Sequence, residues 1–82
     1  MEELTMEKEK FINLIIEEKP EIMDYENVDL VEEGILDSLD IMRITTKMEA
    51  YFDVEIDPDD IDPENFASVE SMWEMLLKNK RE

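Results

Sequence analysis

The sequence contains neither cysteine nor histidine, and its only glycine is Gly34. Without cysteine it has no disulfide bond and no thiol of its own to act as a nucleophile. Without histidine, a metal ion could be held only by oxygen ligands. One glycine cannot make a glycine-rich phosphate loop, and no serine stands at a spacing that would pair it with a base. These absences argue against catalysis by the chain alone, and we expect a protein that is not an enzyme.

Basic residues are also scarce, since 8 Lys and Arg accompany 25 Asp and Glu and leave a net charge of −17 over 82 residues. Nucleic acids and anionic membranes are ordinarily bound by clustered Lys and Arg. We therefore expect no nucleic-acid partner and no membrane insertion, and any charged partner should be basic. The length suits a single domain, residues 1–82. We expect a monomer that is held marginally against its own charge and is stabilised by salt.

Long apolar runs are missing as well. The longest, Leu14-Ile15-Ile16, is far too short for a membrane span or a signal core, and the acidic start of the chain is unlike a secretory signal. We expect a soluble, cytoplasmic protein. Leu, Ile, Val and Phe nevertheless make up 23 of the 82 residues, which is enough for a highly charged chain to fold around a core.

Apolar residues at near-helical spacing predict a first helix over residues 4–19, which Pro20 ends. Residues 21–36 have no clean period and are interpreted as a long loop. We expect this loop to be anchored to the core by Ile22, Tyr25, Val28, Leu30 and Val31. At 16 residues it exceeds the ~12–15 of ordinary structureless connections, which suggests that function lies near its end.

A second helix is predicted to begin after Asp37, which is followed three residues later by Asp40 in a short-armed version of the capping box. A core-facing stripe then recurs at helical spacing: Ile41, Ile44, Met48 and Phe52. Leu39, Met42 and Thr46 fall on a neighbouring stripe. Leu39 and Met42 are therefore two apolar side chains that the core need not absorb.

The rest of the chain predicts a short helical turn and a last helix. Asp57 precedes Pro58 at the start of the turn, and Pro63 follows it. Ser68 caps the last helix, whose predicted buried face is Val69, Met72, Trp73 and Leu76 and whose basic end is Lys78, Lys80 and Arg81. Residues 53–57 alternate like a strand, but a lone strand has nothing to pair with. The predicted fold is all-α, with three main helices and a short third helix before the last.

Ser38 is the one residue whose placement suggests attached chemistry. It opens a helix whose first-turn N–H groups favour an anion such as phosphate, although serine is common at any helix start. Two other interpretations stay open. Residues 53–64 could form a Ca²⁺ loop, but Pro58 occupies the position that needs glycine. The chain could also be an acidic interaction module, a nucleic-acid mimic or inhibitor that covers a basic surface.

The run from Glu33 to Asp40, with the sequence Glu-Gly-Ile-Leu-Asp-Ser-Leu-Asp, resembles the attachment-site motif of acyl carrier proteins. These are small acidic four-helix domains that carry phosphopantetheine on the serine of an Asp-Ser-Leu triplet. The resemblance continues through the core stripe of the second helix and through residues 54–61 and 65–69. It covers residues 30–77 well and the first helix only by type.

The resemblance implies that the chain carries acyl or aminoacyl groups as thioesters on 4′-phosphopantetheine, in fatty-acid, polyketide or related specialised biosynthesis. A phosphopantetheinyl transferase that uses Mg²⁺ would attach this arm to Ser38 from coenzyme A, which makes the chain a phosphoprotein. Acyl-loading and acyl-processing enzymes with basic docking surfaces would be the other partners. The partner-facing positions that the resemblance implies are Asp37, Leu39, Asp40, Met42 and Arg43.

Two features bear on the pathway. Arg43 stands where carriers of fatty-acid synthesis usually have an acid, which favours a specialised carrier. Carriers of peptide synthetases tend to have a second glycine before the Asp-Ser pair, where this chain has Ile35 and Leu36. The cargo stays open between these pathways. Because the chain begins at Met1 and closes soon after the last predicted helix, we expect a free-standing carrier.

Overall fold

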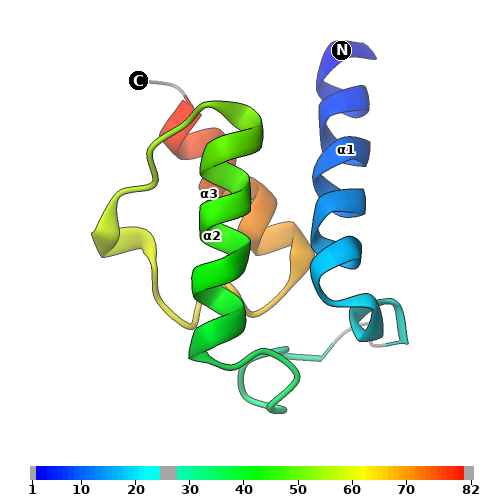
Figure 1. Ribbon diagram of the computed structural model, residues 1–82, viewed down its shortest axis with the longest axis vertical. Coiled ribbons are helices and arrows are strands. Elements are labelled where there is room, and N and C mark those ends of the chain that lie inside the picture. The colour runs from blue at the N-terminus through cyan, green and yellow to red at the C-terminus, as the bar shows by residue number, and fades with distance from the viewer. Residues whose placement is uncertain (1, 25–27, 81–82) are drawn as a thin grey trace.

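The computed structural model describes residues 2–24 and 28–80, with side chains from residue 6 onward, and these residues are helical or irregular with no strand among them (Figure 1). Three α-helices and two 3-10 helices follow in the order α1 (Glu2–Glu18), η1 (Pro20–Asp24), α2 (Ser38–Phe52), η2 (Pro58–Asp60) and α3 (Val69–Lys80). The predicted all-α class and the short helix before the last are confirmed.

The core lies where α1 packs against α2 and α3. Phe11 is fully buried at its centre, with ring centroids 5.4 Å from Trp73 of α3 and 6.2 Å from Phe52 of α2. Leu14 and Ile15 follow Phe11 at three and four residues and are also buried, because side chains at this spacing share one helix face. The first helix thus ends as predicted, just before Pro20.

The predicted long loop over residues 21–36 connects α1 to α2, but it has local structure that was not predicted. Its first part belongs to η1, and residues 29–36 form a closed turn. The carboxylate of Asp29 accepts backbone hydrogen bonds from Val31 and Glu32 at 3.0 and 2.9 Å, and the carbonyl of Leu30 accepts from Ile35 and Leu36. This segment therefore holds its shape through its own backbone bonds.

Not all of the predicted loop anchors are placed in the core. Ile22 and Leu30 are buried and Val31 is partly buried, whereas Val28 is exposed and Tyr25 lies outside the described residues. Leu36, which was not predicted as an anchor, is buried just before α2 with 1% exposure. The loop is attached to the segment just before α3 through a backbone bond of 2.7 Å from the N–H of Leu30 to the carbonyl of Ala67.

The predicted start and core face of α2 are both observed. The N–H of Asp40 donates to the side chain of Asp37 at 2.9 Å, and the N–H of Asp37 donates to the side chain of Asp40 at 3.2 Å. This reciprocal capping box satisfies two backbone donors at the helix start. Ile44 and Met48 are fully buried, and Ile41 and Phe52 pack against the core while partly exposed.

Residues 53–57 form no strand but an extended connection that other elements hold. The N–H of Ile56 donates to the carboxylate of Glu49 at 3.0 Å, and the N–H of Asp57 donates to the side-chain carbonyl of Asn79 in α3 at 2.9 Å. Asp57 also caps η2 by accepting from the N–H of Asp59 at 2.9 Å.

The last helix begins where the sequence predicts. The hydroxyl of Ser68 accepts from the N–H of Ser71 at 3.0 Å. Of the predicted inner face, Val69 is partly buried, and the buried residues of α3 are Met72, Trp73, Met75 and Leu76. Met75 was not predicted, and Arg81 lies outside the described residues. No helix among the described residues combines the length and the apolar character needed to cross a membrane.

Candidate attachment site

Ser38 is the first residue of α2 and is exposed. In Figure 1 the turn of residues 29–36 curls beneath this end of the helix, so the serine stands where the loop and the helix meet. A hydroxyl here has the unpaired first-turn N–H groups and the positive end of the helix dipole beside it, and both favour a phosphate ester. The residues present therefore fit a phosphate-linked group.

Gly34 shapes the approach to this serine. Its φ angle is +78°, a left-handed conformation that glycine adopts without steric cost. A Cβ atom built on Gly34 would meet no heavy atom within 4 Å, so its backbone angle, and not lack of space, calls for glycine. The N–H of Gly34 donates to the carbonyl of Val31 at 3.1 Å and so helps to close the turn before Asp37.

The two acids that flank Ser38 are not equivalent. Asp37 is exposed, whereas the side chain of Asp40 is only 13% exposed and lies 3.1 Å from the ammonium of Lys19. Burial would raise the pKa of the Asp40 carboxyl. The hydrogen bond from the Asp37 N–H and the contact with Lys19 outweigh burial and hold that pKa below its usual value. The hydrogen bond between Lys19 and Asp40 also raises the pKa of the Lys19 ammonium. Asp40 was predicted to face partners, but its carboxylate is bonded to Lys19 and to the N–H of Asp37 within the chain.

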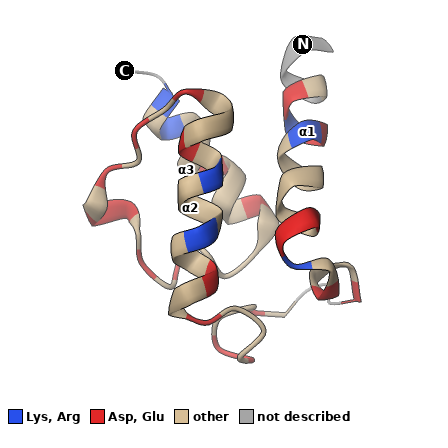
Figure 2. Cartoon of the chain, viewed as in Figure 1, with Lys and Arg blue, Asp and Glu red and all other residues tan. Residues whose placement is uncertain are grey.

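Other acids gather on the loop side of the serine. Asp29, Glu32 and Glu33 are exposed in the turn that precedes Asp37, and Figure 2 shows acidic residues along this turn. The side chain of Asp29 accepts two backbone hydrogen bonds within the turn. The carboxylates of Glu32 and Glu33 form no ion pair with another residue in the described part of the chain. The approach to Ser38 from the loop is thus strongly negative.

The helix side of the serine has a different character. We use "α2 outer face" for the exposed residues of α2 beyond Ser38, which are Leu39, Met42, Arg43, Thr46, Lys47, Ala50 and Tyr51. Leu39 and Met42 are 55% and 65% exposed, so neither fills the core. The two acids within this stretch, Asp40 and Glu49, are partly buried and bonded to Lys19 and to the Ile56 N–H.

Two parts of this arrangement were not predicted. The ion pair between Lys19 and Asp40 joins residues 21 positions apart, and no local pattern in the sequence signals it. Lys47 stands one turn after Arg43 on the outer face, and the spacing of four residues could have identified this pair. The Ca²⁺ loop considered over residues 53–64 gains no support, because no group of three or more acidic side chains in the described ranges converges as metal ligands would.

The sequence matches a known protein family over most of its length. The sequence model of the family described as "Phosphopantetheine attachment site" matches residues 11–76, which is well over half of the chain. No curated protein matches the sequence. The matched residues extend from Phe11 in α1 to Leu76 in α3 and include the loop, Ser38 and the α2 outer face. Domains of this family are attachment sites for the cofactor and are not catalytic themselves; they interact with phosphopantetheinyl transferases and other enzymes. The chain belongs to the phosphopantetheine attachment-site family, and its cofactor is 4′-phosphopantetheine.

Proposed function

We propose that Ser38 is the residue to which 4′-phosphopantetheine is attached. The observation that carries this proposal is the position of Ser38, which is exposed at the first residue of α2, directly after the N-cap Asp37. The capping box and the Lys19–Asp40 pair hold this turn in place, so the hydroxyl is presented from a fixed backbone.

The chemistry follows from that position. The Ser38 oxygen would attack a phosphorus atom of the coenzyme A pyrophosphate on the transferase, forming a new P–O bond. The P–O bond to the nucleotide would break, the hydroxyl proton would be lost, and adenosine 3′,5′-bisphosphate would leave. The bound arm supplies the thiol that this cysteine-free chain lacks. The side-chain oxygen of Ser38 is thus the atom to which the arm is attached. The first turn of α2 would stabilise the negative charge of the phosphodiester.

The cargo in this proposal is an acyl or aminoacyl group carried as a thioester, in a fatty-acid, polyketide or related specialised pathway of the cytoplasm. Arg43 on the outer face favours a specialised carrier. The exposed acids on the loop side, Glu32, Glu33 and Asp37, are the contacts that we assign to basic docking surfaces on the transferase and on acyl-loading and acyl-processing enzymes. The carrier would work as a single domain and as a monomer.

The test is the intact mass of the full chain after incubation with coenzyme A, Mg²⁺ and a broad-specificity phosphopantetheinyl transferase. We expect wild type to gain one phosphopantetheine and Ser38→Ala to gain none. Ser68→Ala is the matched control, because Ser68 also starts a helix yet should leave modification intact. An unmodified wild type, or a modified Ser38→Ala protein, would refute the assignment.

A further inference from the structure

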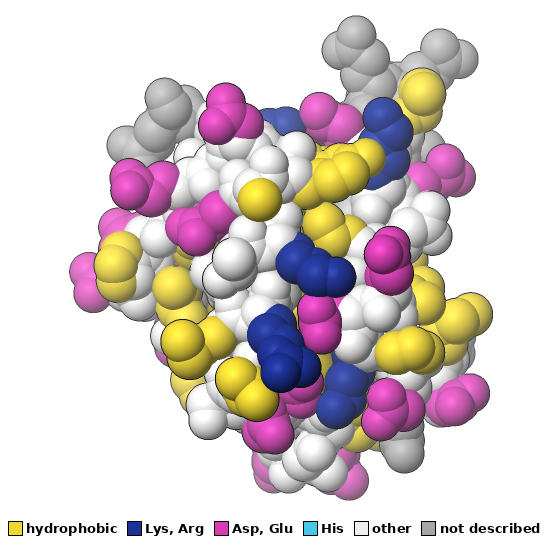
Figure 3. All heavy atoms as spheres, viewed as in Figure 1, with side chains coloured by type: hydrophobic (Ala, Val, Ile, Leu, Met, Phe, Trp, Pro, Cys, Tyr) yellow, Lys and Arg dark blue, Asp and Glu magenta, His cyan; other side chains and the backbone are white. Residues whose placement is uncertain are grey.

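The α2 outer face carries no exposed acid, although 25 of the 82 residues of the chain are acidic. Figure 3 shows dark-blue basic side chains following one another down this side of the molecule, where α1 and α2 meet, with a few magenta acidic side chains between and beside them. In Figure 2 two of the basic bands lie on α2 itself. They belong to Arg43 and Lys47, and Lys10 adds a third cation from α1. Lys19, after the end of α1, is instead paired with Asp40 and Glu21. The distribution of charge around Ser38 is therefore two-sided, with acids on the loop and cations along the helix.

Arg43 and Lys47 share a single internal counter-ion. Glu18 lies 4.0 Å from the Arg43 guanidinium and 3.3 Å from the Lys47 ammonium. The Glu18 side chain is only 15% exposed, whereas both cations are far more exposed and extend above it. The exposed Glu17 of α1 also lines this region, so Lys10, Arg43 and Lys47 face two carboxylates, those of Glu17 and Glu18. Three cations against two carboxylates leave this part of the surface with a net positive charge within an otherwise negative protein.

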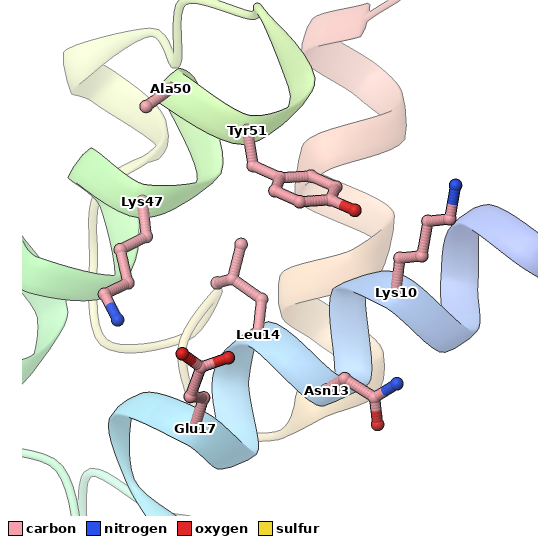
Figure 4. Close-up of a pocket in the computed structure, with 7 residues that line it drawn as sticks. All are labelled: Lys10, Asn13, Leu14, Glu17, Lys47, Ala50 and Tyr51. Carbon is pink, nitrogen blue, oxygen red and sulfur yellow. The ribbon is translucent and has the colours of Figure 1, made fainter.

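A groove lined by apolar, polar and charged side chains adjoins the two cations. It encloses about 590 Å³ between α1 and α2. Figure 4 shows the side chains of Leu14 and Tyr51 facing the space between the helices, with Lys47 and Lys10 at opposite ends of it and the carboxylate of Glu17 at the Lys47 end. Leu14 is nearly buried and forms an apolar floor, while Tyr51 is mostly exposed. A groove with this floor, with two cations and only one carboxylate, Glu17, in its lining, suits an apolar side chain accompanied by carboxylates.

We infer that the α2 outer face and this groove dock an acidic surface of a partner enzyme, in which carboxylates surround one apolar side chain. The apolar side chain would enter the groove beside Tyr51, and the carboxylates would face Arg43, Lys47 and Lys10. This inference rests on the proposed attachment at Ser38, since Leu39 of the outer face is the next residue along the chain. It also means that the basic docking surface of a partner enzyme binds only on the loop side of Ser38, where Glu33 and Asp37 lie.

A two-sided surface of this kind sets orientation. A partner that carries a basic patch and an acidic patch can bind in one orientation only, because the opposite orientation places like charges together. The net charge of −17 does not prevent this, since at about 0.15 M salt the screening length is about 8 Å and nearby charges dominate. The exposed apolar Leu39 and Met42 favour a protein surface here over a nucleic acid.

The experiment uses the unmodified, ¹⁵N-labelled full chain and a helical peptide of zero net charge. The peptide carries glutamates around a phenylalanine at one end, lysines at the other end, and a nitroxide label at the acidic end. We expect the label to broaden the amide signals of residues 43–51 and to spare those of residues 29–37. A label moved to the lysine end should reverse the pattern. With the label at the acidic end, equal broadening of both regions, or stronger broadening of residues 29–37, would overturn the inference. It would also be overturned if the peptide did not bind at all, or if a short single-stranded oligonucleotide displaced the labelled peptide as well as the unlabelled peptide does.

Charge variants provide the second arm of the test. Arg43→Glu combined with Lys47→Glu should weaken peptide binding by about fivefold or more and abolish the orientation. Lys8→Glu combined with Lys78→Glu is the matched control, because it changes the net charge equally and also removes two surface ion pairs. Arg43→Gln with Lys47→Gln serves if the first variant is poorly folded. An equal loss in the control would overturn the inference. Because the peptide binds the unmodified chain, failure here is separate from failure of modification at Ser38.

Discussion

The ammonium nitrogen of Lys19 lies 3.1 Å from the Oδ2 atom of Asp40, and the same oxygen accepts the backbone N–H of Asp37 at 3.2 Å. Lys19 directly follows α1, and Asp40 belongs to the first turn of α2. One carboxylate therefore completes the cap of α2 and ties that cap to the end of α1. The turn that presents Ser38 is fixed by both contacts.

Asp40→Asn tests this relationship through pH. The pKa of Asp40 is lower in the folded protein than its usual 3.8, so its contribution to stability is fully present above that value and is lost as the pH falls through the lower, folded value. We expect Asp40→Asn to melt below wild type at neutral pH, and the difference to shrink as the pH falls below 3.8. Glu33→Gln, which removes an exposed loop charge, is the control. A difference that stays constant into strong acid would contradict the assignment.

Asp37→Ala should destabilise the protein by about 1 kcal/mol, because the side chain that accepts the N–H of Asp40 is lost. For a domain of this size that corresponds to a fall in melting temperature of about 4–8 °C. Asp37→Asn keeps a side-chain oxygen at the N-cap and should melt close to wild type. Thermal unfolding followed by circular dichroism measures both variants. Equal losses for Ala and Asn would mean that the charge of Asp37, and not its capping bond, matters.

Leu39→Ala and Met42→Ala should leave the free energy of unfolding within about 0.5 kcal/mol of wild type, because both side chains are mostly exposed. We expect both to slow the attachment of phosphopantetheine, measured as the rate of mass gain. Ile44→Ala, on the same helix but fully buried, should instead cost about 2–5 kcal/mol. A marked fall in melting temperature for Leu39→Ala, with unchanged attachment, would place Leu39 in the core and the docking surface elsewhere.

Asn79→Ala should destabilise the protein by about 1–2 kcal/mol. The Asn79 side chain accepts the N–H of Asp57 at 2.9 Å and donates to the carboxylate of Asp60 at 3.2 Å, so it joins α3 to the connection that leads into η2. Each such bond contributes about 1 kcal/mol net. Glu74→Ala, an exposed substitution on the same helix, is the control in urea unfolding. An Asn79→Ala protein as stable as this control would show that the two Asn79 bonds add nothing to the stability of the fold.

Added salt should raise the melting temperature, because screening relieves the repulsion among charges that sum to −17. NaCl and MgCl₂ compared at equal ionic strength separate screening from ion binding. Equal rises indicate screening, and a larger rise with MgCl₂ indicates that Mg²⁺ binds. A melting temperature that neither salt changes would contradict the idea that repulsion among the acidic residues limits stability.

The sequence alone determines the features that depend on neighbours a few residues apart. The start of α2 could be predicted because Asp37 and Asp40 cap each other within one turn, and the burial of Ile44 and Met48 follows from their spacing of four residues. The exposure of Leu39 and Met42 follows from the same helical period. Ser38 could be singled out for the same reason, since its position at a helix start is a local property.

Tertiary structure alone decides the features that join distant segments. The sequence predicted a loop over residues 21–36 with Leu30 as one of its anchors, but not the partner of Leu30, because the bond from Leu30 to Ala67 spans 37 positions. The placement of Lys19 beside Asp40 and of Glu18 beneath Arg43 and Lys47 depends on how α1 packs against α2. Local sequence patterns set which side of one helix is apolar, but the neutralisation of a surface charge depends on which residue of another helix lies opposite it. The α2 outer face therefore became recognisable as an acid-free, positively charged surface only when the helices were packed together.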